Sequence, residues 1–324
     1  MKRPYFFEIF TVANFAVIDL VLWRITRAPL VTITHSMLTL LPALAIQTAI
    51  GVAIRAIWRR RESLSAIRSR QWLTDTARIL VFSALFVHTY GWIKLTIPLV
   101  HPRLFDQALW NIDRALFFGH SPNIFFLDLF GPLLRFFDWS YANVFIASIN
   151  IASIIFLSAP QQRLRIGFMN SNTLMWLTGA WLYVLVPSLG PAYRFPEVWL
   201  PLSAALANTQ QLQRILMTNY QHVLHMRTGN FLLGVAAFPS LHVAFEVLAW
   251  LWMRRVSRIA SGVFAAFVIL IFLGSVITGW HYLIDSIAGV ALAVICYAAF
   301  GVRRLAAALK SGAKAPHSEG NTGA

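Results

Sequence analysis

Long apolar runs alternate with short polar or basic segments along the whole chain. A helix needs about 20 mostly apolar residues to cross the hydrocarbon core of a membrane, so runs of that length bounded by Arg, Lys or Pro predict spans. Eight runs fit, at residues 5–23, 30–54, 73–100, 137–159, 171–187, 238–253, 259–278 and 281–301. The first is the weakest, because Glu8, Asn14 and Asp19 interrupt it. The pattern predicts an all-α polytopic transmembrane helical bundle.

Two long segments between the runs carry further patterns. Residues 101–136 alternate polar turns with apolar stretches, which is typical of amphipathic helices in the membrane interface. Residues 188–237 contain the sequence GPAYRFP and a polar stretch, and they are too long for a passive turn. We expect this second segment to cover a site.

Composition supports a membrane protein. The chain is 58% hydrophobic and 12% charged, which excludes an ordinary soluble domain. Its net charge of +15 raises the question of nucleic acid, but a domain binding DNA or RNA would carry more charge and no apolar runs of this length. The single cysteine, Cys296, can form no intrachain disulfide.

The basic residues follow the membrane topology. With both termini in the cytoplasm, 17 of the 27 Lys and Arg residues lie on the cytoplasmic side, as the positive-inside bias requires. The basic run at 55–70 is expected to contact anionic lipids there. We divide the chain into N-terminal spans (1–70), a catalytic membrane domain (71–303) and a disordered cytoplasmic tail (304–324), and expect a bacterial inner membrane as its location.

Ionisable side chains in the last spans are the candidates for chemistry, because a membrane-embedded charge is costly. His242 follows a Pro-Ser turn in FPSLH, and His281 and Asp285 are four residues apart in HYLID, on one helical face. Both helices run from outside to inside, so the two histidines lie at similar depth near the extracytoplasmic end. Asp285 can accept a hydrogen bond from Nδ1–H of His281 and leave Nε2 as a nucleophile, with His242 as the general acid. Each residue alone also fits a packing role; the combination is harder to explain by packing.

The two motifs resemble the second and third signatures of the type 2 phosphatidic acid phosphatase superfamily. The resemblance covers mainly the six spans from residue 73 onward and implies a six-helix core plus two N-terminal spans. It is strongest to the branch of the fungal inositol phosphorylceramide synthases and their bacterial relatives, because of Leu241, the stretch GSVITGW, the phrase DRALFFGHSP and the GPAYR loop. It implies a phosphohistidine on His281, leaving-group protonation by His242, orientation by Asp285, and neither metal nor cofactor.

The sequence departs from that superfamily in its cations. Superfamily phosphatases neutralise the phosphate with a Lys and two Arg residues, whereas here the first signature is not recognisable and Ser275 lies where the third has its Arg. The replacement candidate is Arg194, with Tyr193 as a hydrogen-bond donor. The further candidates for substrate binding are Ser240, Ser275 and Glu246. Arg194 fits an interfacial, lipid-contacting arginine equally well. Glu246, one turn beyond His242, either supports His242 as an acid or is a neutral, hydrogen-bonded glutamate.

Three functions stay open. The first is transfer of a phospholipid headgroup, such as inositol phosphate, from a phospholipid donor to a lipid alcohol. The second is hydrolysis of a lipid phosphate or polyprenyl pyrophosphate, with water as the acceptor. The third, of another class, is a non-catalytic lipid transporter or scaffold that keeps the fold. A site with few cations favours a phosphodiester, which has one ionised oxygen, and so favours transfer.

Overall fold

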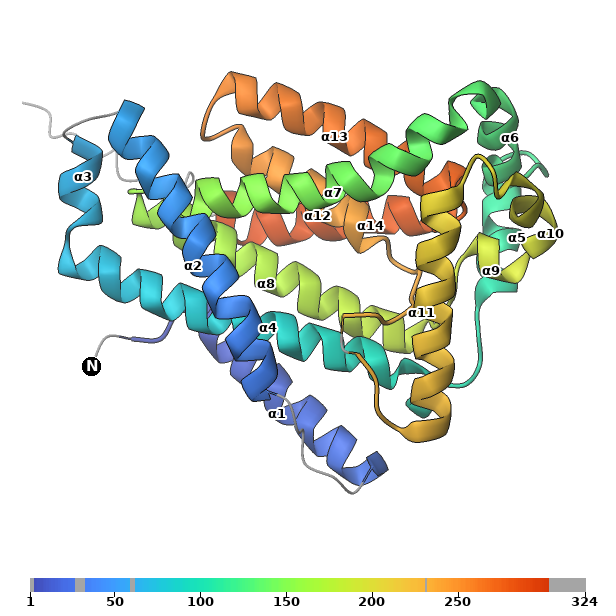
Figure 1. Cartoon of the computed structure of the whole chain (residues 1–324), viewed down its shortest axis with the longest axis horizontal. Coiled ribbons are helices and arrows are strands. Elements are labelled where there is room, and N and C mark those ends of the chain that lie inside the picture. Colours follow the sequence, from blue (N-terminus) through green and yellow to red (C-terminus); the bar gives the residue numbers. More distant parts are fainter. Residues whose placement is uncertain (1–2, 27–32, 59–61, 231, 303–324) are drawn as a thin grey trace, which may run out of the picture.

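The computed structural model describes residues 3–26, 33–58, 62–230 and 232–302, and these contain helices and no strand. Every predicted span contains a helix. The corresponding helices are α1 (Phe6–Thr26), α2 (Ile33–Trp58), α4 (Arg70–Val100), α7 (Leu134–Leu157), α8 (Gln162–Leu185), α12 (Leu241–Met253), α13 (Arg258–Ile277) and α14 (Leu283–Tyr297). The last six of these run alongside one another, and α2 crosses them at an angle (Figure 1). The predicted all-α bundle is confirmed, while the predicted tail lies outside the described residues.

Six helices among the described residues are long and apolar enough to cross a membrane, and they indicate an integral membrane protein. Two of the eight predicted spans do not meet both conditions. Helix α8 is 24 residues long but carries Arg163, Arg165 and Asn172. Helix α12 is apolar but has 13 residues, or about 20 Å, against a hydrocarbon core of about 30 Å.

Helix α12 is the centre of the core. Nearly every one of its residues is buried, which matches its apolar character on all sides. It packs against α7, α8, α13 and α14. The helix that carries His242 in its first turn is therefore held on all sides by other helices.

The polar residues that interrupt the first predicted span have partners on neighbouring helices. Glu8 forms an ion pair with Arg78 of α4, and Asn14 accepts a hydrogen bond of 2.7 Å from the indole of Trp181 on α8. These contacts satisfy polar groups that would otherwise be costly in a membrane. Helix α1 is among the six candidate spans.

The two long segments form short helices at one end of the bundle. The first contains α5 (Asp106–Leu116) and α6 (Pro122–Leu129), and the second contains α9 (Pro191–Arg194), α10 (Pro196–Trp199) and α11 (Ala207–Met226). Helix α11 lies across the ends of the bundle helices and packs on α4 and α7 (Figure 1). Asp138 of α7 anchors its start by accepting hydrogen bonds from the backbone N–H groups of Asn208 and Thr209.

Candidate active site

His242 and His281 meet beneath α11. Their ring centroids are 5.8 Å apart, although 39 residues separate them in sequence. His242 lies in the first turn of α12, and His281 lies just before α14. The start of α12 is tied to α14 by a hydrogen bond of 2.9 Å from the backbone N–H of Ser240 to the carbonyl of Asp285. The juxtaposition expected from topology is present.

The hydrogen bonds of His281 define its tautomer. Nδ1 lies 2.8 Å from the carbonyl oxygen of Ala237, and a carbonyl can only accept. Nδ1 therefore carries the hydrogen, and Nε2 keeps its lone pair. An Nε2 with a free lone pair is the form that a nucleophile requires.

Asp285 does not receive the hydrogen bond that its spacing from His281 suggests. Its Oδ2 lies 3.5 Å from Nδ1 of His281 and accepts a 2.9 Å hydrogen bond from the backbone N–H of Tyr282. Ala237 replaces it as the partner of Nδ1 because the loop before α12 passes directly beside the ring. Asp285 is close enough to act on the charge of the imidazole but caps its own helix instead of holding the ring.

Three buried polar residues that sequence analysis did not place at the site hold the His281 loop. Asp113 of α5 accepts hydrogen bonds of 2.6 and 2.8 Å from the N–H groups of Leu283 and Ile284. Asn123 of α6 donates to the carbonyl of His281 at 3.0 Å. Asp106 accepts from the Tyr282 hydroxyl at 2.9 Å. The segment expected to lie in the interface thus turns these three polar groups inward, and nothing in the sequence distinguishes them from the polar residues that stay exposed.

The contribution of Asp113 to the stability of the folded protein depends on pH. Burial raises its pKa to about 6, above the ordinary value of 3.8, so between these values the folded protein binds a proton that the unfolded chain does not. Protonated Asp113 therefore contributes its full stabilisation of the folded state below about pH 4, and this contribution is lost as the pH rises through 6. We expect the melting temperature of the wild type to exceed that of Asp113→Asn by a growing margin as the pH falls from 7 to 4. A constant margin in thermal melts would contradict this.

A small cavity of about 130 Å³ opens beside His242. It lies between α7 and α11, and its walls are mainly apolar, including Tyr141, Phe145 and Trp280. The ring of Phe145 lies edge-on to His242 with centroids 4.2 Å apart. Nδ1 of His242 is buried and has no hydrogen-bond partner among the described residues. A titratable ring without a fixed partner, facing a cavity, is suited to moving a proton to or from a bound molecule.

Glu246 is buried one turn beyond His242 and bonds elsewhere. Its Oε1 accepts a hydrogen bond from the hydroxyl of Ser148 on α7. Of the two alternatives for Glu246, this contact favours the hydrogen-bonded glutamate, because the bonded partner is a serine hydroxyl. Support of His242 stays a hypothesis.

The other substrate-binding candidates lie in less direct positions. Arg194 is exposed on α9, with Nη2 3.3 Å from Oε1 of Gln107. The Tyr193 hydroxyl donates to the carbonyl of Gln213. Ser275 is buried and directs its hydroxyl to the carbonyl of Phe272, while its own carbonyl accepts from the N–H of His281. Ser240 is the N-cap of α12. These residues shape and cap the site, and no contact brings the Arg194 guanidinium onto the histidines.

Lys94 is the cation that the structure brings toward the histidine pair. It lies on α4, its Nζ is 5.6 Å from the ring centroid of Tyr183, and its charge acts on His281. Its side chain also lies against Gly234, where an added Cβ would be 2.8 Å from the Lys94 Cγ. In the sequence Lys94 belongs to the apolar run at residues 73–100. Its depth, two turns before the outer end of its helix, is the signal that matches it to the histidines.

The histidines of α11 contact neighbouring groups of the same segment. Nδ1 of His225 lies 2.7 Å from the carbonyl of Gln221, and His222 lies beside Thr228. Within the part of the chain that the structure describes, no group of three or more His, Cys, Asp or Glu residues could hold a metal ion.

Comparison with known proteins places the site in a family. A family model described as the PAP2 superfamily matches residues 107–299, which is more than half of the chain. The match includes His242, His281 and Asp285 and leaves out α4 with Lys94. Neither the curated proteins nor the solved structures give a match. The chain belongs to the PAP2 superfamily, that of the type 2 phosphatidic acid phosphatases.

Proposed function

We propose that the protein transfers the phosphorylated headgroup of a phospholipid to a lipid alcohol through a phosphohistidine on His281. Membership of the PAP2 superfamily indicates a phosphatase-type enzyme acting on lipid phosphoesters. The observation that carries the mechanism is the free Nε2 of His281, which follows from the bond between Nδ1 and Ala237. It supports transfer and hydrolysis alike, because both begin with the same attack.

The reaction has two balanced steps. The Nε2 lone pair attacks phosphorus, the bond to the departing oxygen breaks, and His242 gives that oxygen a proton. An acceptor hydroxyl then attacks phosphorus, His242 takes its proton, and the bond to Nε2 breaks. Asp285, 3.5 Å from Nδ1, stabilises the positive charge of the phosphorylated ring.

The phosphate group is best accommodated at the start of α12. The first N–H groups of a helix attract anions, but those of Leu283 and Ile284 in α14 are already bonded to Asp113. The charge of Lys94 acts on His242, which lies at the start of α12. One lysine suits the single charge of a phosphodiester better than a dianionic monoester, and this favours headgroup transfer.

Apolar space beside the site supports a lipid acceptor. The cavity next to His242 is lined by aromatic and aliphatic side chains, which suit a lipid alcohol better than water. A second, larger cavity of about 360 Å³ lies between α2, α4, α7 and α8 and reaches Tyr90 and Phe245. Phe245 lies one turn from His242, so a chain in this cavity would end near the histidines.

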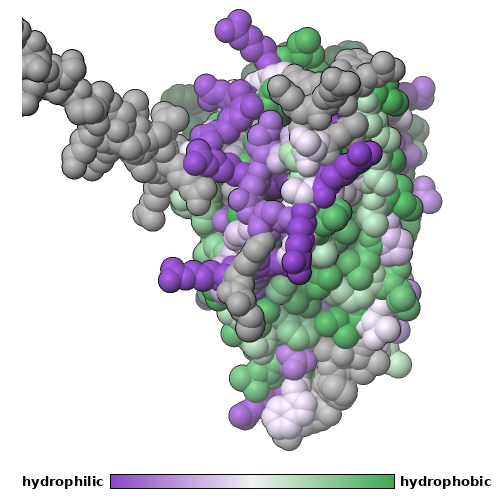
Figure 2. Space-filling model, turned by 90° about the vertical axis from the view of Figure 1, so that its left-hand side faces the viewer, coloured by the Kyte–Doolittle hydropathy of each residue, from purple (hydrophilic) through white to green (hydrophobic). Residues whose placement is uncertain are grey.

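The positive-inside bias supports an extracytoplasmic site and cytoplasmic termini. Figure 2 shows hydrophilic side chains gathered at the end of the bundle opposite α11. Arg163 lies in the first turn of α8 and Arg254 directly after α12, at the ends of these helices that are far from α11 (Figure 1). A bacterial inner membrane remains part of the proposal.

The test supplies phosphatidylinositol labelled in its headgroup phosphate to the purified protein, with and without a lipid alcohol such as ceramide. We expect a labelled lipid product only when the alcohol is present and His281 is intact. Release of free phosphate at the same rate with or without the alcohol would establish hydrolysis and overturn transfer. The His281→Asn variant controls for a contaminating activity.

A further inference from the structure

A further pocket, distinct from the two cavities near the histidines, lies at the opposite end of the bundle. It has a volume of about 570 Å³ and is bounded by α2, the end of α7, the start of α8 and the turn between α12 and α13. Trp252 lines it, ten residues beyond His242 on α12, or about 15 Å along the helix axis. The pocket is therefore separate from the candidate active site.

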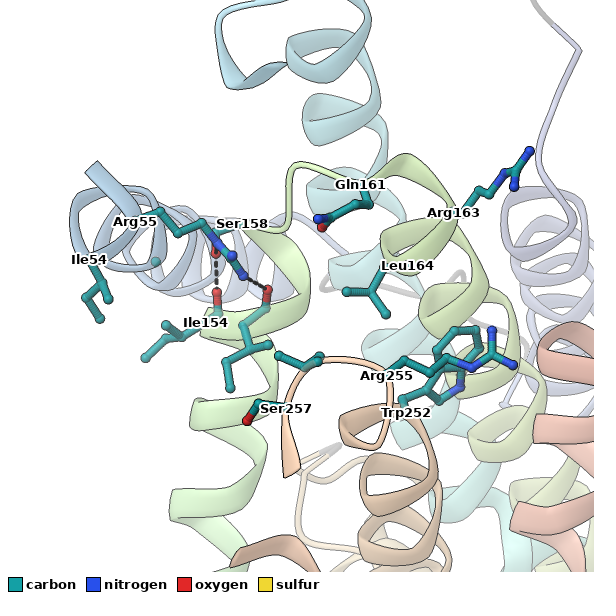
Figure 3. A pocket seen from close by; sticks show the side chains of 13 residues that line it. Ile54, Arg55, Ile154, Ser158, Gln161, Arg163, Leu164, Trp252, Arg255 and Ser257 are labelled. Atoms are coloured by element: carbon teal, nitrogen blue, oxygen red, sulfur yellow. Dashed lines mark hydrogen bonds between the residues drawn. The ribbon is translucent and has the colours of Figure 1, made fainter. Parts of the chain in front are cut away.

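Arginines from three different elements line this pocket. Arg55 enters from α2 and donates to the hydroxyl of Ser158 at 3.0 Å and to the carbonyl of Ile155 at 2.9 Å. Arg255 lies on the opposite side, against Trp252, and Arg163 extends outward from the first turn of α8 (Figure 3). No Asp or Glu is among the described residues that line the pocket. Its field is accordingly positive.

The remaining lining residues are apolar or neutral. Ile54, Ile154 and Leu164 form apolar walls, while Gln161 and Ser257 offer neutral hydrogen-bonding groups. The pocket lies where α7 ends and α8 and α13 begin. This is the level at which the membrane-crossing helices meet the polar interface. A pocket that combines positive charge with apolar walls at this depth suits an anion that carries an apolar chain. A free anion would not need the apolar walls.

Close helix packing builds the pocket floor. An added Cβ at Gly51 would lie 2.3 Å from the Ser158 hydroxyl, so α2 and α7 touch there. One at Gly167 would lie 2.4 Å from the Trp252 ring, so α8 and α12 touch there. Arg55 follows Gly51 by one turn, so the contact at Gly51 sets its position. The walls are fixed before any ligand arrives.

We propose that this pocket binds the phosphodiester headgroup of an anionic phospholipid, with the first part of an acyl chain along Ile54, Ile154 and Leu164. The three arginines surround the phosphate with positive charge, and a bound phosphate draws the outward-extending side chain of Arg163 into a charge-assisted hydrogen bond. Such a lipid bridges the N-terminal helix α2 to the α12–α13 turn. The site is independent of the proposed transfer reaction and serves to hold the bundle together.

The experiment measures thermal unfolding of the full-length protein in a non-ionic detergent. The additions are phosphatidylglycerol, phosphatidylcholine or inorganic phosphate. A ligand that binds only the folded state raises the melting temperature in proportion to its occupancy. We expect phosphatidylglycerol to raise it by several degrees and the other two to have no comparable effect. An equal effect of phosphatidylcholine would remove the requirement for net negative charge, and an equal effect of inorganic phosphate would remove the requirement for lipid; either overturns the proposal.

Matched double variants separate the pocket from the general charge of this face. Arg163→Gln with Arg255→Gln removes two pocket charges, and Arg254→Gln with Arg258→Gln removes two exposed charges at the same end that do not line the pocket. The pocket variant should lose at least half of the lipid-induced shift, while the control keeps it. Equal losses in both would overturn the site. Arg255 also donates to the Tyr297 hydroxyl and to the carbonyl of Gly301. The exposed single variant Arg163→Gln therefore provides a test without those contacts, and an unreduced shift there counts against the site.

Discussion

Replacing His281 with asparagine is expected to lower the turnover of lipid phosphoester by at least about 10⁴-fold, because it removes the nucleophile. The asparagine amide can still donate to the carbonyl of Ala237, as Nδ1 does now at 2.8 Å. Only the Nε2 lone pair is lost, so the loop should keep its place. The measurement is initial rate with labelled phospholipid, together with acid-labile phosphate on the protein, which should disappear.

His242→Asn is the companion variant. Loss of a general acid lowers rates by about 10²–10⁴-fold, so this change should be the less severe of the two.

Two outcomes would contradict the assignment of the nucleophile. If acid-labile phosphate still formed on the His281→Asn protein, another residue would be the nucleophile. Full function of both variants in cells would instead favour the non-catalytic transporter or scaffold.

The helices and the meeting of the histidines could be predicted because they depend on local and topological information. An apolar run of 20 residues indicates a helix whatever it packs against. His242 and His281 lie at the starts of two parallel helices and so at the same depth, and the ring centroids are indeed 5.8 Å apart. The interruptions at Glu8 and Asn14 looked unfavourable only because their partners, Arg78 and Trp181, are distant in sequence.

The hydrogen bonds around His281 could not be predicted, because they depend on chain segments brought together by folding. A spacing of four residues places Asp285 on the same face as His281, but it does not decide which acceptor Nδ1 reaches first. The carbonyl of Ala237, 44 residues away, takes that place. Asp113 faces inward for a similar reason: its partners are the N–H groups that start α14, which cannot bond within their own helix.

The sequence favours Arg194 as the cation that binds the phosphate, whereas in the structure the charge of Lys94 acts on the histidines. Both are single cations near predicted span ends, and the sequence offers no measure of which side chain turns inward. Lys94 lies on α4 against Tyr183 and Gly234 inside the bundle. Arg194 lies on the exposed side of α9, against Phe195 and Gln107. We therefore expect Lys94 to supply the main positive charge for the phosphate.

Gly289→Ala is expected to lower stability and, to a greater extent, turnover. The added methyl group would lie 2.3 Å from the carbonyl oxygen of Ser240, which α14 approaches at the start of α12. Backbone cannot yield as a flexible side chain can, and overpacking of this kind costs about 1–3 kcal/mol. The same shift moves His242 away from His281. The measurements are thermal unfolding and initial rate, compared at a temperature where the variant is fully folded.

Gly262→Ala is the matched control on α13. Nothing lies within 4 Å of a Cβ built at Gly262, so the substitution adds no contact and gains the preference of alanine for a helix, about 0.5–1 kcal/mol. Its turnover should equal that of the wild type. If Gly289→Ala matched it in both measurements, the contact between Gly289 and Ser240 would not be what sets the separation of the two histidines. A large loss of turnover with a small loss of stability would instead show that the packing of α14 on α12 positions the reacting groups.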